Sequence, residues 1–283
     1  MTKRNQTKGK SSKRGLPWFA WLGICLGIVA IIVLICILPT DQTANSSNSG
    51  EPRAAIIDQL YGFGYSNQEF TDEVTDSLES YGLQVDLYQG DKVSVDLYRS
   101  LPEHGYKVII FRAHSGLVQG EEHPLKTSLF TNESYSRSKY VGEQLNEELL
   151  QARVSEGYPF YFAIASKFVT DKMKGHFDGT VIVMAGCSGL YLQDLAQSFI
   201  QKGASTYLAW DNSVELKYVD HATIALIKNL CAENLTIEKA VSRTMEQEGL
   251  DPVWGAELKY YPRQSHDRTL KELTGGLPEQ NEN

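Results

Sequence analysis

Apolar residues in this chain occur in short continuous runs, and most of these runs are bounded by glycine or polar residues. Runs of this length rich in β-branched residues are typical of buried strands. The segments between them carry apolar residues at helical spacing. Strands that alternate with helices in this way predict a three-layer α-β-α domain with a mostly parallel central sheet. We expect strands at 54–58, 84–88, 106–112, 158–165, 180–184 and 204–210, and helices at 68–81, 93–101, 143–154, 171–176, 190–202, 218–232 and 236–248.

Two of the predicted strands end in small-residue turns that carry a reactive side chain. The run from Gly179 to Gly189 presents Cys187, and the run from 106 to 112 is followed directly by His114. The carboxyl ends of parallel strands meet at one edge of a sheet, where catalytic groups collect. A cysteine in such a turn is as readily a small buried residue as a reactive one, and a lone histidine is usually structural or merely exposed. The matched context of these two residues nevertheless favours a shared site.

The first part of the chain has the pattern of a membrane anchor. Trp18–Leu38 is 21 residues without a charge, long enough to cross a bilayer as a helix. The basic residues before it predict a cytoplasmic amino terminus and an extracytoplasmic body. A cleaved signal peptide is the alternative, but its apolar region would be unusually long. We therefore divide the chain into a basic tail (1–15), an anchor (16–38), a flexible linker (39–52), one domain (53–267) and a polar tail (268–283).

Charge argues against nucleic acid as a partner. Six of the 27 Lys and Arg residues lie within residues 1–14, which contain no acid, so the remainder of the chain has 21 basic against 35 acidic residues. Such a body repels a polyanion. A Gly-x-Gly pair at Gly62 and Gly64 lacks the rest of a nucleotide-binding motif, and we expect no cofactor and no metal there.

The blocks VIIFRAHSG, with His114, and GTVIVMAGCSG, with Cys187, resemble the caspase-like cysteine peptidases across residues 53–262. Residues 203–214 look most similar to CHAT domains and to bacterial or archaeal members. The resemblance implies a Cys-His dyad that hydrolyses peptide bonds in a polypeptide substrate without a cofactor. It also implies backbone donors to an oxyanion at Cys187 and at the residue after the histidine. That residue is Ser115 here, and Gly116 comes next, so the second donor is open between them.

The end of the next strand offers candidates for the substrate pocket. Trp210 and Asp211 follow the run 204–210, and a free carboxylate at Asp211 would favour Lys or Arg before the scissile bond. A capping role for Asp211 is equally compatible with the pattern. Ala185 and Gly186 supply no polar group, so an acid-binding pocket of the caspase type is not expected.

Several alternatives remain open at this point. Cys187 could form a disulfide with Cys231 outside the cytoplasm. The turn at Cys187 also resembles the nucleophile elbow of α/β-hydrolases, which would need a later histidine, His221 or His266. The domain could instead be a non-catalytic module that binds a partner. The segment 132–139 is a possible processing site through Arg137 and Lys139, and glycosylation sequons begin at Asn45, Asn132 and Asn234.

Overall fold

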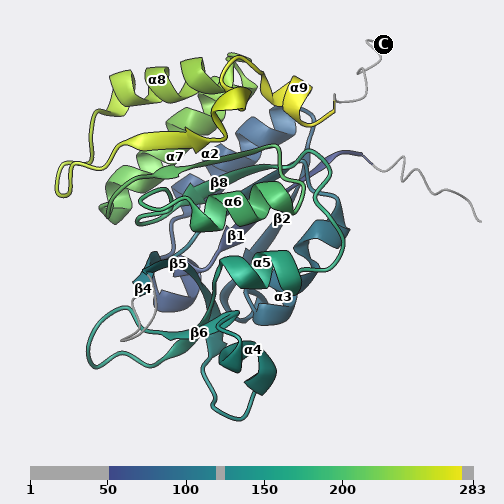
Figure 1. Ribbon diagram of the computed structural model, residues 1–283. Helices are drawn as coiled ribbons and strands as arrows, with labels where there is room; N and C mark the ends of the chain where they lie inside the picture. The colour runs from purple at the N-terminus through teal and green to yellow at the C-terminus, as the bar shows by residue number, and fades with distance from the viewer. Residues whose placement is uncertain (1–50, 119–124, 276–283) are drawn as a thin grey trace, which may run out of the picture. The chain divides into compact units, whose positions relative to one another are not determined.

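A six-stranded sheet with helices on both faces forms the centre of the computed structural model, which describes residues 51–118 and 125–275 (Figure 1). The strand order is β10-β9-β8-β3-β1-β2. All neighbouring pairs are parallel except β10 and β9, which are antiparallel. The predicted mixed α/β fold with a mostly parallel central sheet is therefore confirmed. The strands are β1 (Arg53–Asp58), β2 (Gln84–Gln89), β3 (Val108–Arg112), β8 (Val181–Ala185), β9 (Thr206–Trp210) and β10 (Leu258–Tyr261).

Alternate residues of the central strands enter two separate cores. Ile56, Ile110 and Val183 pack against one group of helices, while Ile57, Phe111 and Met184 pack on the opposite face. Because both faces are covered, the strands are apolar throughout rather than alternating in polarity. The first face is covered by α2 (Gln68–Ser80), α7 (Leu216–Cys231) and α8 (Ile237–Glu248), and the second by α3 (Val95–Ser100), α5 (Ser166–Asp171) and α6 (Asp194–Gln201).

A second, antiparallel sheet lies in the chain between β3 and β8. The sequence predicts a helix over 143–154, and that prediction is wrong for most of the segment. A short helix α4 (Val141–Leu145) ends before Glu147, which adopts a left-handed backbone with φ 57°. The chain then enters β6, which pairs with β7 and buries Leu149 and Ala152. The sheet order is β4 (Ser115–Val118), β5 (Lys126–Ser134), β7 (Tyr161–Ile164), β6 (Leu149–Ala152).

The packed domain extends beyond residue 267, where the sequence predicts a polar tail. Helix α9 (Leu270–Leu273) begins with a capping box at Thr269 and Glu272 and buries both of its leucines. The likewise predicted short helix at 171–176 is displaced, because α5 already ends at Asp171. The predicted membrane anchor at 16–38 lies outside the described residues. Among the helices that the structure does describe, none is long and apolar enough to cross a membrane.

Candidate functional site

His114 and Cys187 lie at the same edge of the sheet, beyond the carboxyl ends of adjacent parallel strands. In the register of β3 and β8, Arg112 is the partner of Ala185, and each reactive residue follows two positions later. The pairing continues past the strands, because Ala113 N donates to Ala185 O at 3.2 Å. The hydroxyl of Ser115 also donates to the carbonyl oxygen of Cys187. The two turns are therefore joined by direct hydrogen bonds.

The glycine before Cys187 is required by this close approach of the two turns. A Cβ at Gly186 would lie 2.2 Å from the carbonyl oxygen of Ala113, a distance that real contacts do not reach. The turn continues through Ser188, whose φ of 55° is in the left-handed region, and Ser188 N donates to Asn212 O at 2.8 Å. The thiol is thus presented by a turn fixed to strands on both sides.

The Cys187 side chain is half-buried and contacts the segment after β9. Val214 N donates to Sγ at 3.5 Å, and Sγ lies 3.8 Å from Val214 O, to which it donates. Burial raises the pKa of the thiol above its ordinary value, and Asp251 adds to the rise, while the contacts with Val214 and Ser213 oppose it. The same Asp251 accepts from Glu215 N at 2.6 Å and so anchors the segment that holds the thiol.

The His114 ring is enclosed by aromatic side chains. Phe63 approaches it edge to face with a centroid distance of 5.0 Å, and Phe130 lies at 5.9 Å. Burial, followed by the nearby charge of Arg112, lowers the pKa of His114 from 6.5 to about 4. Its Nε2 atom is buried without a hydrogen-bond partner among the described residues. At neutral pH the ring is therefore uncharged and its Nε2 is uncommitted.

The backbone of His114 is held by a buried glutamine. Gln59, which follows β1, accepts from His114 N through Oε1 at 2.9 Å. Its Nε2 donates to Asn132 Oδ1 at 2.9 Å, and its backbone N donates to Arg112 O at 2.9 Å. Gln59 has no exposed surface. One amide side chain thus fixes the histidine turn to β5 and to β1.

A buried cluster of charges lies at the ends of β1 and β3. Arg112 donates to both oxygens of Asp220 at 2.7 and 2.8 Å and to Asp58 at 2.8 Å. Its Nη1 also donates to the carbonyl oxygen of Tyr65 at 2.8 Å. Because every charge in the cluster has hydrogen-bonded partners, burial of the cluster is tolerated. The sequence pattern does not predict this cluster or the role of Gln59. The one visible signal is that a charged residue, Asp58 or Arg112, ends each of two apolar strands.

The pairing of β4 with β5 distinguishes Ser115 from Gly116, the two candidates for the second oxyanion donor. Phe130 N donates to His114 O at 3.0 Å, and this bond flanks the pairing of Ser115 with Leu129. In an antiparallel ladder such a pair is not hydrogen-bonded, so its N–H groups point away from the partner strand. Ser115 N–H therefore points away from β5, whereas the next pair, Gly116 with Ser128, faces inward. The backbone N–H of Cys187 donates no hydrogen bond within the described part of the chain.

Trp210 and Asp211 do not form an open pocket. Trp210 is the last residue of β9 and is fully buried in the core. The Asp211 carboxylate accepts from Glu257 N at 2.8 Å and lies 4.0 Å from Lys259 Nζ, so it is engaged with β10 and the residue before it. The structure therefore offers no free carboxylate at position 211.

The two later histidines lie on other parts of the domain. His221 is exposed on α7 and lines a cavity on the side of α2. His266 is exposed, and its Nδ1 contacts Arg263 O at 3.1 Å. Neither contacts Cys187. The left-handed residue of the turn is Ser188 rather than Cys187, which also differs from a strained nucleophile elbow.

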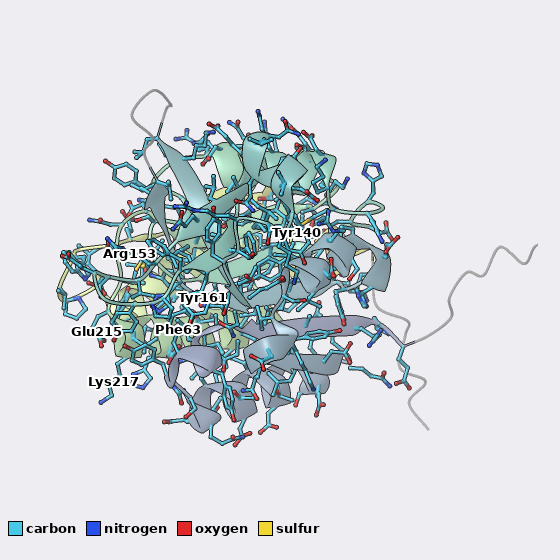
Figure 2. All side chains as sticks on the ribbon, turned by 90° about the horizontal axis from the view of Figure 1, so that it is seen from below. Phe63, Tyr140, Arg153, Tyr161, Glu215 and Lys217 are labelled. Carbon is cyan, nitrogen blue, oxygen red and sulfur yellow. The ribbon has the colours of Figure 1, made fainter. Side chains whose placement is uncertain are left out.

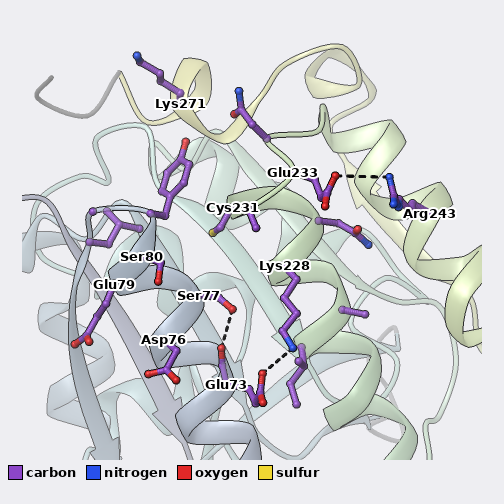
Figure 3. Close-up of a pocket in the computed structure, with 18 of the residues that line it drawn as sticks. Glu73, Asp76, Ser77, Glu79, Ser80, Lys228, Cys231, Glu233, Arg243 and Lys271 are labelled. Carbon is purple, nitrogen blue, oxygen red and sulfur yellow. Dashed lines mark hydrogen bonds and ion pairs between the residues drawn. The ribbon is translucent and has the colours of Figure 1, made fainter. Parts of the chain in front are cut away.

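Cys187 and Cys231 are both free thiols in this structure. Cys231 ends α7, is buried in the core on the α2 side, and has a pKa raised by burial to about 12. It lines a cavity of about 1620 Å³ between α2 and α7 (Figure 3). Ion pairs of Lys228 with Glu73 and of Arg243 with Glu233 cross or border this cavity. The cavity contains neither His114 nor Cys187.

The Asn132 side chain, which begins one of the glycosylation sequons, makes hydrogen bonds within the domain. Asn132 Nδ2 donates to Gly90 O at 2.9 Å, and its Oδ1 accepts from Gln59. Arg137, Lys139 and Asn234 are exposed, and Asn45 lies outside the described residues. Within those residues no group of three or more His, Cys, Asp or Glu is placed to hold a metal ion.

No protein-family model matches the chain, and no curated protein matches it.

Proposed function

We propose that this protein is a membrane-anchored cysteine peptidase of the caspase-like type, with Cys187 as nucleophile and His114 as general acid and base. The observation that carries the proposal is the pairing of these two residues beyond adjacent parallel strands, with Ser115 linking the turns. Helices on both faces of a mostly parallel sheet also fit the caspase-like resemblance. The anchor and the extracytoplasmic position of the domain rest on the sequence alone.

The chemistry follows from the side chains present. The Cys187 thiol gives its proton to the neutral His114 ring, and the thiolate adds to the carbonyl carbon of the scissile peptide bond. The imidazolium then protonates the leaving amine, and a thioester to Cys187 remains. Water adds to the thioester with His114 as base, which releases the acid product and the free thiol. The N–H groups of Cys187 and Ser115 are the donors proposed to stabilise the oxyanion.

The resting thiol must move before it reacts. Sγ contacts Val214, and no hydrogen bond joins it to the His114 ring within the described part of the chain. A rotation of the Cys187 side chain toward His114 is therefore the first step after substrate binds. Basic specificity before the scissile bond loses its main support, because the Asp211 carboxylate is engaged by Glu257 and Lys259.

Variants of the full chain in detergent test the proposal. We expect Cys187→Ala and His114→Ala each to lower kcat/KM toward a peptide library by roughly a thousandfold or more. Cys231→Ala, His221→Ala and His266→Ala serve as controls and should retain activity. Loss of activity in His266→Ala or His221→Ala, with His114→Ala active, would instead support the α/β-hydrolase mechanism. Absence of hydrolysis by the wild type, with its thiol reduced, would favour a non-catalytic binding module.

A further inference from the structure

Aromatic side chains lie beside the His114 ring, and two of them come from the segment after β1, which is on the opposite side of β3 from β8 and Cys187. We call this group the aromatic ledge and define it as Phe63, Tyr65 and Tyr161. Phe63 and Tyr65 have centroid distances to His114 of 5.0 and 6.3 Å, and Tyr161 lies 4.7 Å from Phe63. Figure 2 shows Phe63 and Tyr161 on the same side of the domain. The ledge combines segments that are almost a hundred residues apart in sequence.

The ledge is partly exposed, since Phe63 and Tyr161 are half-buried and Tyr65 is exposed, although the backbone of the 61–65 segment is held by hydrogen bonds. Tyr65 is 41% exposed. Its carbonyl oxygen accepts from the buried Arg112, and its N donates to Leu60 O at 3.1 Å. Tyr61 N donates to the buried Asp58 at 3.1 Å. A preorganised apolar surface loses little conformational entropy when a ligand covers it, so this arrangement suits binding better than core packing.

Strand order places the ledge on one particular side of the reaction centre. The sheet runs β9-β8-β3-β1, and the turns that follow these strands carry Val214, Cys187, His114 and the ledge residues Phe63 and Tyr65, respectively. Cys187 therefore has the segment after β9 on one side and His114 on the other. The ledge lies one strand further, next to the imidazole.

The chemistry assigns the leaving half of the substrate to this side. The acyl half becomes bonded to Cys187, while the amine that departs must lie within hydrogen-bond reach of the His114 ring. The residue that contains this amine carries the first side chain after the scissile bond. That side chain is then within about one residue length, ~3.8 Å, of the group that Phe63 and Tyr65 flank.

We propose that the aromatic ledge of Phe63, Tyr65 and Tyr161 binds the side chain immediately after the scissile bond and selects polypeptides with an aromatic or large aliphatic residue there. This inference rests on the proposed peptidase function. The three ledge side chains carry no formal charge, and the nearest buried charge, Arg112, is already shared by Asp58, Asp220 and the Tyr65 carbonyl. An aromatic ring gains most by packing edge to face or offset against such rings.

The test uses the full chain in detergent and quenched fluorescent peptides that share one cleaved sequence. The peptides differ only after the scissile bond, where they carry Phe, Leu, Gly, Asp or Lys. We expect kcat/KM for the Phe and Leu peptides to exceed that for the Gly peptide by about tenfold, which is the discrimination that one apolar contact typically provides. Tyr65→Ala should reduce the Phe-to-Gly ratio to within about twofold of unity, while Tyr65→Phe should keep it.

Tyr191→Ala is the matched control, because Tyr191 is also an exposed tyrosine, 55% exposed in the segment after Cys187, and is not one of the ledge residues. It should leave the Phe-to-Gly ratio unchanged. Equal rates for Phe and Gly, a preference for Asp or Lys, or a Phe preference that survives Tyr65→Ala would each overturn the ledge as the selecting surface. Such results still show peptide hydrolysis. Absence of any cleavage that depends on both His114 and Cys187 would overturn the proposed function, and the ledge proposal with it.

Discussion

The two cysteines of the described domain occupy contrasting surroundings. Cys187 follows the end of β8, is half-buried, and contacts the backbone N–H and carbonyl of Val214. Cys231 ends α7 in the apolar core on the α2 side, and burial raises its pKa to about 12. The Cys187 thiol lies among polar groups at the sheet edge that also carries His114. The Cys231 thiol packs in the core as a small apolar side chain would. The position of a cysteine at the end of a strand, rather than its thiol alone, therefore distinguishes a candidate nucleophile from a cysteine that only fills space in the core.

The largest expected difference between the two regions is in thiol reactivity. Iodoacetamide should label Cys187 in the native protein more than about a hundredfold faster than Cys231, because alkylation needs an accessible thiolate. Mass spectrometry of the labelled peptides measures both rates. Similar rates at the two cysteines would remove the distinction on which the peptidase proposal depends.

The pH dependence of this labelling has a definite sign. The pKa of Cys187 is raised and that of His114 is lowered to about 4, so the resting pair is a thiol with a neutral imidazole. The thiolate fraction, and with it the labelling rate, should therefore still be rising between pH 7 and pH 9, with no plateau near neutral pH. A rate that is already on a plateau between pH 6 and 8 would show a preformed thiolate-imidazolium pair instead.

A smaller difference in activity is expected between variants of two buried amide side chains, Gln59 near His114 and Asn229 near Cys231. Gln59→Ala leaves the backbone N–H of His114 without its partner. If His114 is the proposed general acid and base, its misplacement should lower kcat by about 10- to 100-fold. Asn229→Ala, near Cys231, removes hydrogen bonds to Thr244 and Gln247. Both variants should lose about 1–3 kcal/mol of unfolding free energy in urea titrations. Only Gln59→Ala should lose activity; an equal loss in Asn229→Ala would mean that both effects reflect stability alone.

The smallest expected effect is on stability alone. Cys231→Ala removes a buried sulfur from the core and should lower the unfolding free energy by about 1 kcal/mol. Cys187→Ala, at a half-buried position, should change it by less than about 0.5 kcal/mol. Urea denaturation of the reduced proteins measures both. A larger loss in Cys187→Ala would indicate that the thiol is a structural element of its turn.

Local sequence patterns predicted five strands of the central sheet, but not β10, and predicted that His114 and Cys187 follow strands that end at one edge of it. The β-branched run before Met184 can hardly form anything but a buried strand, and parallel strands necessarily bring the residues that follow them to one edge. The roles of Gln59 and Arg112 could not be predicted, because their partners Asn132 and Asp220 are 73 and 108 positions away. Such contacts depend on the completed fold.

The same limit explains the misassigned segments. Apolar spacing in 143–154 is compatible with a helix, but pairing with β7 and the left-handed Glu147 make its second half a strand. For short apolar runs, tertiary pairing decides between the two. Asp211 illustrates the converse problem, since its position at a strand end was identified but its engagement by Glu257 was not.

Gly186 restricts how this edge of the sheet can be altered. Any side chain there would collide with the backbone of Ala113, whereas Gly116 has open space around the position of its missing Cβ. A Cβ at Gly62 would likewise lie 2.4 Å from Asn132 Nδ2. Libraries that aim to change substrate choice should therefore leave residues 186 and 62 unvaried and spread their diversity over residues 63, 65 and 116. Gly186 directly precedes Cys187 in the sequence, yet it is a poor position at which to engineer substrate selectivity.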